Sequence, residues 1–164
     1  MKKIHWIGIL LILVAVLSGC KQNDWLDWKV QNELWLLENA QKEGVVTTPT
    51  GLQYKCIQQG NPSSAKPDDY KQVVINYRGT LINGYQFDSN ENYAGYTTSF
   101  VEGFQEGLKK MHELGTFEFY IPCYLGYDAT TSADRGKGKG TEGSSSFIPP
   151  YSTLIFEVTL KSVN

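Results

Sequence analysis

The chain has 164 residues, a hydrophobic content of 41% and a net charge of −2. This length fits one domain with an additional segment, and the apolar content excludes an intrinsically disordered chain. Because no basic stripe is available to neutralise phosphates, nucleic acid is not an expected partner.

The first residues are typical of an export signal that ends at a cysteine. Lys2 and Lys3 precede an apolar run over 7–17 that is too short to span a bilayer, and small residues then lead to Cys20. The string Leu-Ser-Gly-Cys resembles the lipobox of bacterial lipoproteins, in which the cysteine is acylated after cleavage. We expect a lipoprotein signal peptide over 1–19 and a lipid anchor on Cys20, with an ordinary signal peptide as the alternative.

The predicted anchor sets the expected location of the protein. Lipid chains hold a protein on a membrane without a spanning helix. Lys21 follows Cys20, and it is not the aspartate that retains many bacterial lipoproteins on the inner membrane. We therefore expect a lipid-anchored protein of the bacterial cell envelope, on the outer membrane and facing the periplasm.

Residues 20–50 are predicted to form a tether with an amphipathic helix. Asp24 can begin a helix that runs to about Glu43, where Gly44 ends it, and 45–50 is a linker. The expected apolar side consists of Trp25, Trp28, Leu34, Trp35 and Leu37. This side can dock on a second copy of the chain to give a homodimer, on the membrane surface, or on its own domain, and the sequence leaves these alternatives open.

The segment 51–164 is predicted to be one domain of the α+β class, an antiparallel sheet packed on one short helix. Alternating apolar residues and turn signals predict strands over 52–58, 72–81, 86–88, 116–122 and 152–163. The pair Asn83-Gly84 suits a tight hairpin turn. Apolar residues at helical spacing predict a helix over 101–113.

Other features carry weaker expectations. Cys56 and Cys123 either form a disulfide or are two small buried residues. His112 is the one histidine after the signal peptide, so neither a zinc site nor a Ser-His-acid arrangement is expected. The loop 129–146 contains a Gly-Lys repeat without the spacing of a P-loop, which predicts a mobile loop instead.

Five blocks of this sequence occur in the order of a known family: GLQYK at 51–55, NYRGTLINGYQFDS at 76–89, VEGFQEGL at 101–108, YIPCYLGY at 120–127 and FIPPYSTLIFEVTL at 147–160. Together they resemble the FKBP-type peptidyl-prolyl cis-trans isomerases over essentially all of 51–164. The resemblance implies a twisted antiparallel sheet curled around one short α-helix, here preceded by an N-terminal helix. It also implies an isomerase of X–Pro bonds that needs no cofactor or metal.

The resemblance further implies a pocket for proline-containing polypeptide clients and for macrolide immunophilin ligands. Tyr77 and Phe87 match its aromatic walls, with Asp88 beside them. Val101 matches the position whose backbone N–H binds a carbonyl, and Tyr127 matches a hydroxyl that donates to the ligand. A carboxylate that follows a buried aromatic residue needs a donor, and a tyrosine hydroxyl can supply it.

The remaining pocket positions include departures from the family. Phe104 stands where the family usually has a tryptophan floor, and Ile148 and Phe156 match the remaining apolar wall, with Phe147 as a weaker neighbour. The stretch after Asp88 is short, so the second aromatic wall has only Tyr96 and Phe100 as candidates. The loop 129–146 is longer than usual.

Two functional interpretations follow. Aromatic residues on strands beside a helix are usually core, so taken singly these residues predict a packed interior. With the five blocks, the sequence favours an isomerase of exported proteins. The alternative is a catalytically weak proline-peptide-binding chaperone or an accessory module of a cell-envelope complex.

Overall fold

The computed structural model describes residues 24–127, 139 and 145–164. The predicted signal peptide, Cys20 and most of the predicted loop 129–146 lie outside these residues. No helix of the described part is long and apolar enough to cross a membrane.

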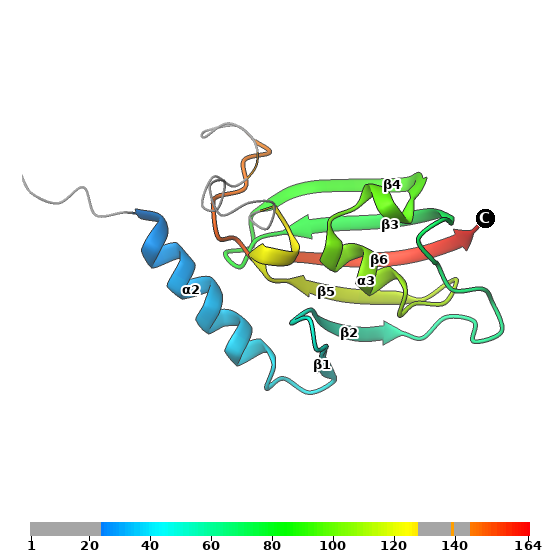
Figure 1. The fold of residues 1–164 in the computed structure, drawn as a ribbon, viewed down its shortest axis with the longest axis horizontal. Coiled ribbons are helices and arrows are strands. Elements are labelled where there is room, and N and C mark those ends of the chain that lie inside the picture. Colours follow the sequence, from blue (N-terminus) through cyan, green and yellow to red (C-terminus); the bar gives the residue numbers. More distant parts are fainter. Residues whose placement is uncertain (1–23, 128–138, 140–144) are drawn as a thin grey trace, which may run out of the picture.

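The centre of the fold is a six-stranded antiparallel sheet with the order β1-β2-β5-β6-β3-β4 (Figure 1). Its strands are β1 (Val45–Thr47), β2 (Gln53–Gln58), β3 (Gln72–Thr80), β4 (Gln86–Tyr96), β5 (Thr116–Ile121) and β6 (Leu154–Val163). A short helix, α3 (Glu102–Leu108), lies across one face of the sheet, and α2 (Asp24–Asn39) precedes it in the chain (Figure 1). The predicted α+β architecture is confirmed.

The core fills the space between α3 and the sheet. On β6 the alternate residues Leu154, Phe156, Val158 and Leu160 are buried, as their spacing predicts. Burying one such side chain contributes roughly 1.5–3 kcal/mol. Gly103 and Gly107 let α3 approach the sheet, because a Cβ at Gly107 would lie 2.7 Å from the Phe119 ring.

Several predicted boundaries were wrong. The first helix ends at Asn39 rather than Glu43, and the expected linker contains β1, which pairs with β2. The strand over 86–88 extends to Tyr96. Its later residues are mostly exposed, so the apolar alternation that marks a half-buried strand is missing. The helix expected over 101–113 ends at Leu108, although Met111 after it is fully buried.

Helix α2 docks on its own domain through its tryptophan side. The Trp28 indole Nε1 donates to Ser152 Oγ at 2.9 Å, and the Trp35 ring lies 5.7 Å from that of Tyr120. The prediction that Leu34 and Leu37 share this side was wrong. Both are exposed, because they lie about 120° and about 180° around the helix from Trp28.

The two remaining cysteines are not joined. Cys56 on β2 is exposed and its thiol donates to Gln59 Oε1 at 3.4 Å, whereas Cys123 is half-buried in a short 3-10 turn, Cys123–Leu125. The disulfide alternative is therefore not formed in this structure, and the expectation that Cys56 is buried was also wrong.

Candidate active site

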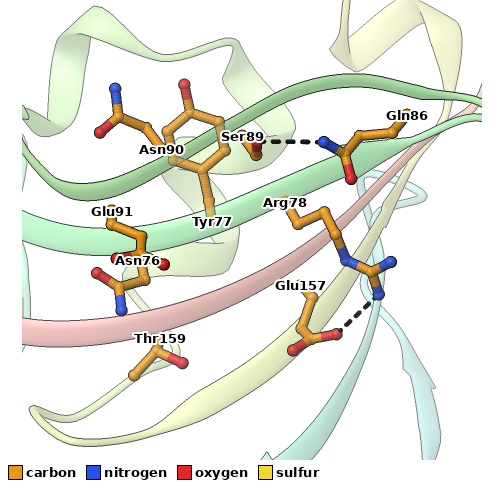
Figure 2. A pocket seen from close by; sticks show the side chains of 9 residues that line it. All are labelled: Asn76, Tyr77, Arg78, Gln86, Ser89, Asn90, Glu91, Glu157 and Thr159. Carbon is orange, nitrogen blue, oxygen red and sulfur yellow. Dashed lines mark hydrogen bonds and ion pairs between the residues drawn. The ribbon is translucent and has the colours of Figure 1, made fainter.

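The sheet carries hollows on both faces, and different kinds of residue line them. On the face away from α3, a hollow of about 560 Å³ lies over β3, β4 and β6. Figure 2 shows its amide and charged side chains, including the Arg78–Glu157 ion pair at 3.2 Å and the Gln86–Ser89 hydrogen bond at 3.2 Å. Such a lining holds water, so it does not provide a dry environment for an amide.

The second hollow, which we call the aromatic pocket, lies on the side of α3 and has a volume of about 400 Å³. Its lining consists of Tyr77, Asp88, Tyr93, Ser99, Phe100, Val101, Phe104, Tyr127, Lys139 and Phe156. Six of the ten are aromatic residues, and they come from β3, β4, β6, the segment leading into α3, α3 itself and the turn after β5. Several of the residues that the family resemblance implies are among this lining.

Phe104 forms the floor of the aromatic pocket. It is 2% exposed and projects from the first turn of α3. Its ring stacks on Phe100 at 4.6 Å between centroids, and it meets the rings of Phe156 at 4.9 Å and Phe119 at 5.4 Å edge to face. Offset-stacked and edge-to-face pairs are the favoured aromatic geometries, so the floor is fixed from several sides.

The walls are formed by Tyr77 from β3 and Tyr93 from β4. Their rings lie 6.0 Å apart, and the Tyr93 ring lies 5.7 Å from that of Phe100. Tyr93 was not predicted from the sequence, because the predicted strand ended at Asp88. Alternation counted from Phe87 does not give the face of Tyr93, because the β3–β4 pairing shifts register between Ile75 and Tyr77 and between Gly79 and Thr80. Of the two candidates that were named, Phe100 lines the pocket, and Tyr96 is exposed outside it.

Two hydrogen bonds between polar side chains lie around the aromatic pocket, one at Tyr77 and one at Tyr127. The Tyr77 hydroxyl donates to Asp88 Oδ2 at 3.0 Å. Burial, and then the bond to the Asp88 carboxylate, raise the pKa of Tyr77 well above its usual range. In the second bond, Lys139 Nζ donates to the Tyr127 hydroxyl oxygen at 3.1 Å.

Val101 contributes a backbone donor at the N-cap of α3. Its carbonyl accepts the N–H groups of Phe104 and Gln105 at 2.9 and 3.0 Å. Its own N–H has no acceptor within 24–127, 139 and 145–164. Val101 lines the pocket, so a donor without an acceptor among the described residues lies beside the aromatic pocket.

Comparison with known proteins agrees with this geometry. The family model described as FKBP-type peptidyl-prolyl cis-trans isomerase matches residues 63–161, and the domain amino terminal to that isomerase matches 21–56. The chain belongs to the FKBP-type peptidyl-prolyl cis-trans isomerase family.

Two curated relatives of this FKBP-type chain are bacterial proteins. It is 37% identical to a probable FKBP-type isomerase FkpA of Neisseria meningitidis, over 82% of this chain and 46% of that protein. It is 36% identical to outer membrane protein MIP of Legionella longbeachae, over 82% of this chain and 54% of the relative. The chain therefore spans about half the length of these curated relatives.

A solved structure shares the fold. The crystal structure of FkpA from Escherichia coli superposes with a TM-score of 0.70 at 28% identity, and the match covers all of this chain and 74% of that one.

The residues implied by the family resemblance fall into two groups. Tyr77, Asp88, Val101, Phe104, Tyr127, Phe156 and the weaker candidate Phe100 line the aromatic pocket. Three others do not. Phe87 packs behind Phe156 with centroids 5.4 Å apart, Ile148 is 2% exposed in the core, and Phe147 lies against Trp25 at 6.0 Å.

Proposed function

We propose that this chain is a peptidyl-prolyl cis-trans isomerase that accelerates X–Pro rotation in exported proteins. The observation that carries the proposal is the Val101 N–H, which has no acceptor among the described residues, together with the Tyr127 hydroxyl beside an aromatic pocket whose floor is Phe104. A client proline enters the pocket, and its neighbouring carbonyls accept from these donors. Macrolide immunophilin ligands are expected to compete for the same space.

The reaction requires no bond to break. Rotation about the peptide bond meets a barrier of roughly 18–20 kcal/mol, because resonance gives the C–N bond partial double-bond character. The planar amide is more dipolar than the twisted one, so an apolar lining favours the twisted form relative to water. Donors placed for the twisted carbonyl add stabilisation that the planar ground state does not receive.

The proposed activity is tested with the full chain in detergent, by NMR exchange between the cis and trans forms of a proline peptide. Tyr127→Phe and Asp88→Val are expected to slow the exchange, and a macrolide ligand is expected to block it. Tyr70→Phe is the matched control, because Tyr70 is 89% exposed and does not line the pocket. Peptide binding without faster exchange in the folded chain would instead support a proline-peptide-binding module.

We also propose that Cys20 carries a lipid that holds the protein on the outer membrane of a bacterial cell envelope. The support is the lipobox-like string before Cys20 and the name of the Legionella relative, an outer membrane protein. Lipid attachment to Cys20 is expected to be lost in Cys20→Ser, which the mass of the purified protein would show.

We propose, in addition, that α2 joins two copies of the chain. Leu26, Val30, Leu34 and Leu37 are each at least half exposed on the side opposite the docked tryptophans. Asp27, Glu33 and Glu38 lie around this stripe, whereas helices that lie on membranes carry Lys and Arg there. Leu34→Cys is expected to cross-link two chains on oxidation. Leu114→Cys, at a similarly exposed leucine, is the control.

A further inference from the structure

Lys139 is fixed beside the aromatic pocket by the backbone. Its N–H donates to the Ile148 carbonyl at 2.9 Å, and the Ile148 N–H donates back to the Lys139 carbonyl at 2.8 Å. Ile148 belongs to the hydrophobic core and is 2% exposed. Close by in the chain, the Tyr85 hydroxyl donates to the Ser145 carbonyl at 2.8 Å. Lys139 is therefore attached to a rigid part of the domain.

The side chain of Lys139 is directed at Tyr127. Its Nζ donates to the Tyr127 hydroxyl oxygen at 3.1 Å and lies 4.6 Å from the centroid of the ring. An ammonium group has three donors, and this bond uses one of them. This bond does not use the Tyr127 hydroxyl proton, which can therefore be donated to a client carbonyl. The Lys139 ammonium and that carbonyl would then both be hydrogen-bonded to the Tyr127 hydroxyl.

The charges of the pocket are arranged asymmetrically. Among its described lining residues, Lys139 and Asp88 are the only charged ones. Asp88 accepts from Tyr77 at the β3–β4 wall, and Lys139 donates to Tyr127 after β5. A carboxylate on a client residue is therefore attracted at the Tyr127 end of the pocket and repelled at the Tyr77 end.

We propose that Lys139 is a specificity-determining residue that makes the pocket favour X–Pro segments with an acidic residue next to the proline. The proposal rests on the proposed isomerase function and names its substrate class. Because Lys139 is exposed, its attraction for a carboxylate is screened by water. Exposed ion pairs of this kind give a preference of about three-fold.

The test uses two peptides that differ only in charge, Ala-Glu-Pro-Phe and Ala-Gln-Pro-Phe. For each, binding to the full chain in detergent is measured by NMR titration, and cis-trans exchange is measured on the same samples. The acidic peptide is expected to be preferred by about three-fold at low salt, and less at high salt. Lys139→Gln is expected to bring the ratio to about one, and Lys139→Glu to invert it.

Lys161→Gln serves as the control. It removes the same charge from the chain at an exposed site on β6 that does not line the pocket, where Lys161 Nζ donates to Asn92 Oδ1 at 2.8 Å. This variant is expected to keep the preference of the unmodified chain. An acidic preference that disappears equally in Lys161→Gln would show a general effect of net charge and would overturn the proposal.

The outcomes separate the two proposals. If the chain isomerises both peptides and the ratio is the same with and without Lys139, the specificity proposal is wrong and the isomerase proposal stands. If the peptides bind with the expected ratio but exchange is not accelerated, the specificity holds for a binding module. If the folded chain neither binds nor isomerises either peptide, both proposals fail.

Discussion

The Tyr77 hydroxyl donates to the Asp88 carboxylate at 3.0 Å and joins β3 to β4 at the edge of the aromatic pocket. The expectation that a tyrosine hydroxyl can supply the donor for Asp88 is confirmed. Burial and the adjacent carboxylate both disfavour the tyrosinate, so they raise the pKa of Tyr77. The hydroxyl is therefore held as a donor to Asp88.

Tyr77→Phe is expected to destabilise the protein by about 1 kcal/mol at neutral pH, because it removes a hydrogen bond to an exposed carboxylate. The folded pKa of Tyr77 is raised above its unfolded value of about 10, so the contribution of the bond is complete below about pH 10. It is lost as the pH rises through the raised value. Urea unfolding should show a constant difference from the unmodified chain between about pH 7 and pH 9, which shrinks only above about pH 10. A difference that already shrinks near neutral pH would contradict this assignment.

Gly79→Ala is expected to disturb the packing behind the pocket. A Cβ at Gly79 would lie 2.7 Å from Phe87 Cε2 and 2.8 Å from Phe156 Cε1, closer than carbon atoms approach without displacement. Because Phe156 lines the pocket, the shift should slow isomerisation and lower stability by about 1–3 kcal/mol. Thermal unfolding and NMR exchange measure the two effects.

Gly84→Ala is the control for this substitution. A Cβ at Gly84 meets no atom within 4 Å, but the residue has φ of +81° in the hairpin turn. Its cost is therefore backbone strain of about 1 kcal/mol, without a change at the pocket. If Gly84→Ala slowed isomerisation as much as Gly79→Ala, general destabilisation would explain both results.

The sequence predicted the sheet and α3 because their residues alternate cleanly or repeat at helical spacing. Buried Leu154, Phe156, Val158 and Leu160 show this best. The sequence did not predict the elements whose formation depends on tertiary contacts. β1 is three residues long and exists through its pairing with β2, and the far half of β4 is an edge with one partner strand. Neither carries a burial pattern of its own.

The residues of the pocket were predicted only where they lie in sequence blocks that resemble the family. Tyr77, Phe104 and Tyr127 were found through blocks that resemble the family. Tyr93 was missed with the end of β4, and Lys139 was missed because its place depends on a backbone bridge to Ile148. The packing of Phe147 on Trp25 depends on where α2 docks, which local sequence does not determine.

Asn32→Leu is expected to loosen α2 from the domain. The Asn32 side chain is 2% exposed. Its Oδ1 accepts the Thr153 N–H at 2.7 Å, and its Nδ2 donates to the Trp28 carbonyl at 2.8 Å. Leucine leaves the buried Thr153 N–H without its acceptor, which costs about 1–3 kcal/mol. Urea unfolding should show this loss, while Gln31→Leu, on an exposed position of the same helix, should change stability by less than about 0.5 kcal/mol. Equal losses in both variants would show that the added apolar surface on α2, and not the lost acceptor of Thr153, lowers the stability.

Phe104→Trp restores the residue that the family usually carries at the pocket floor, and here it is expected to be harmful. Phe104 is enclosed by Phe100, Phe156 and Phe119 at 4.6, 4.9 and 5.4 Å between ring centroids. An indole exceeds this space, and overpacking of a core site costs about 1–3 kcal/mol. The displaced rings should also weaken the binding of proline peptides. Tyr96→Trp, an equally aromatic change at an exposed position of β4, should leave stability within about 0.5 kcal/mol. Unfolding and peptide titration of the two variants test this together. A Phe104→Trp chain that is as stable as the original and binds proline more tightly would show that the floor can rearrange around the larger ring.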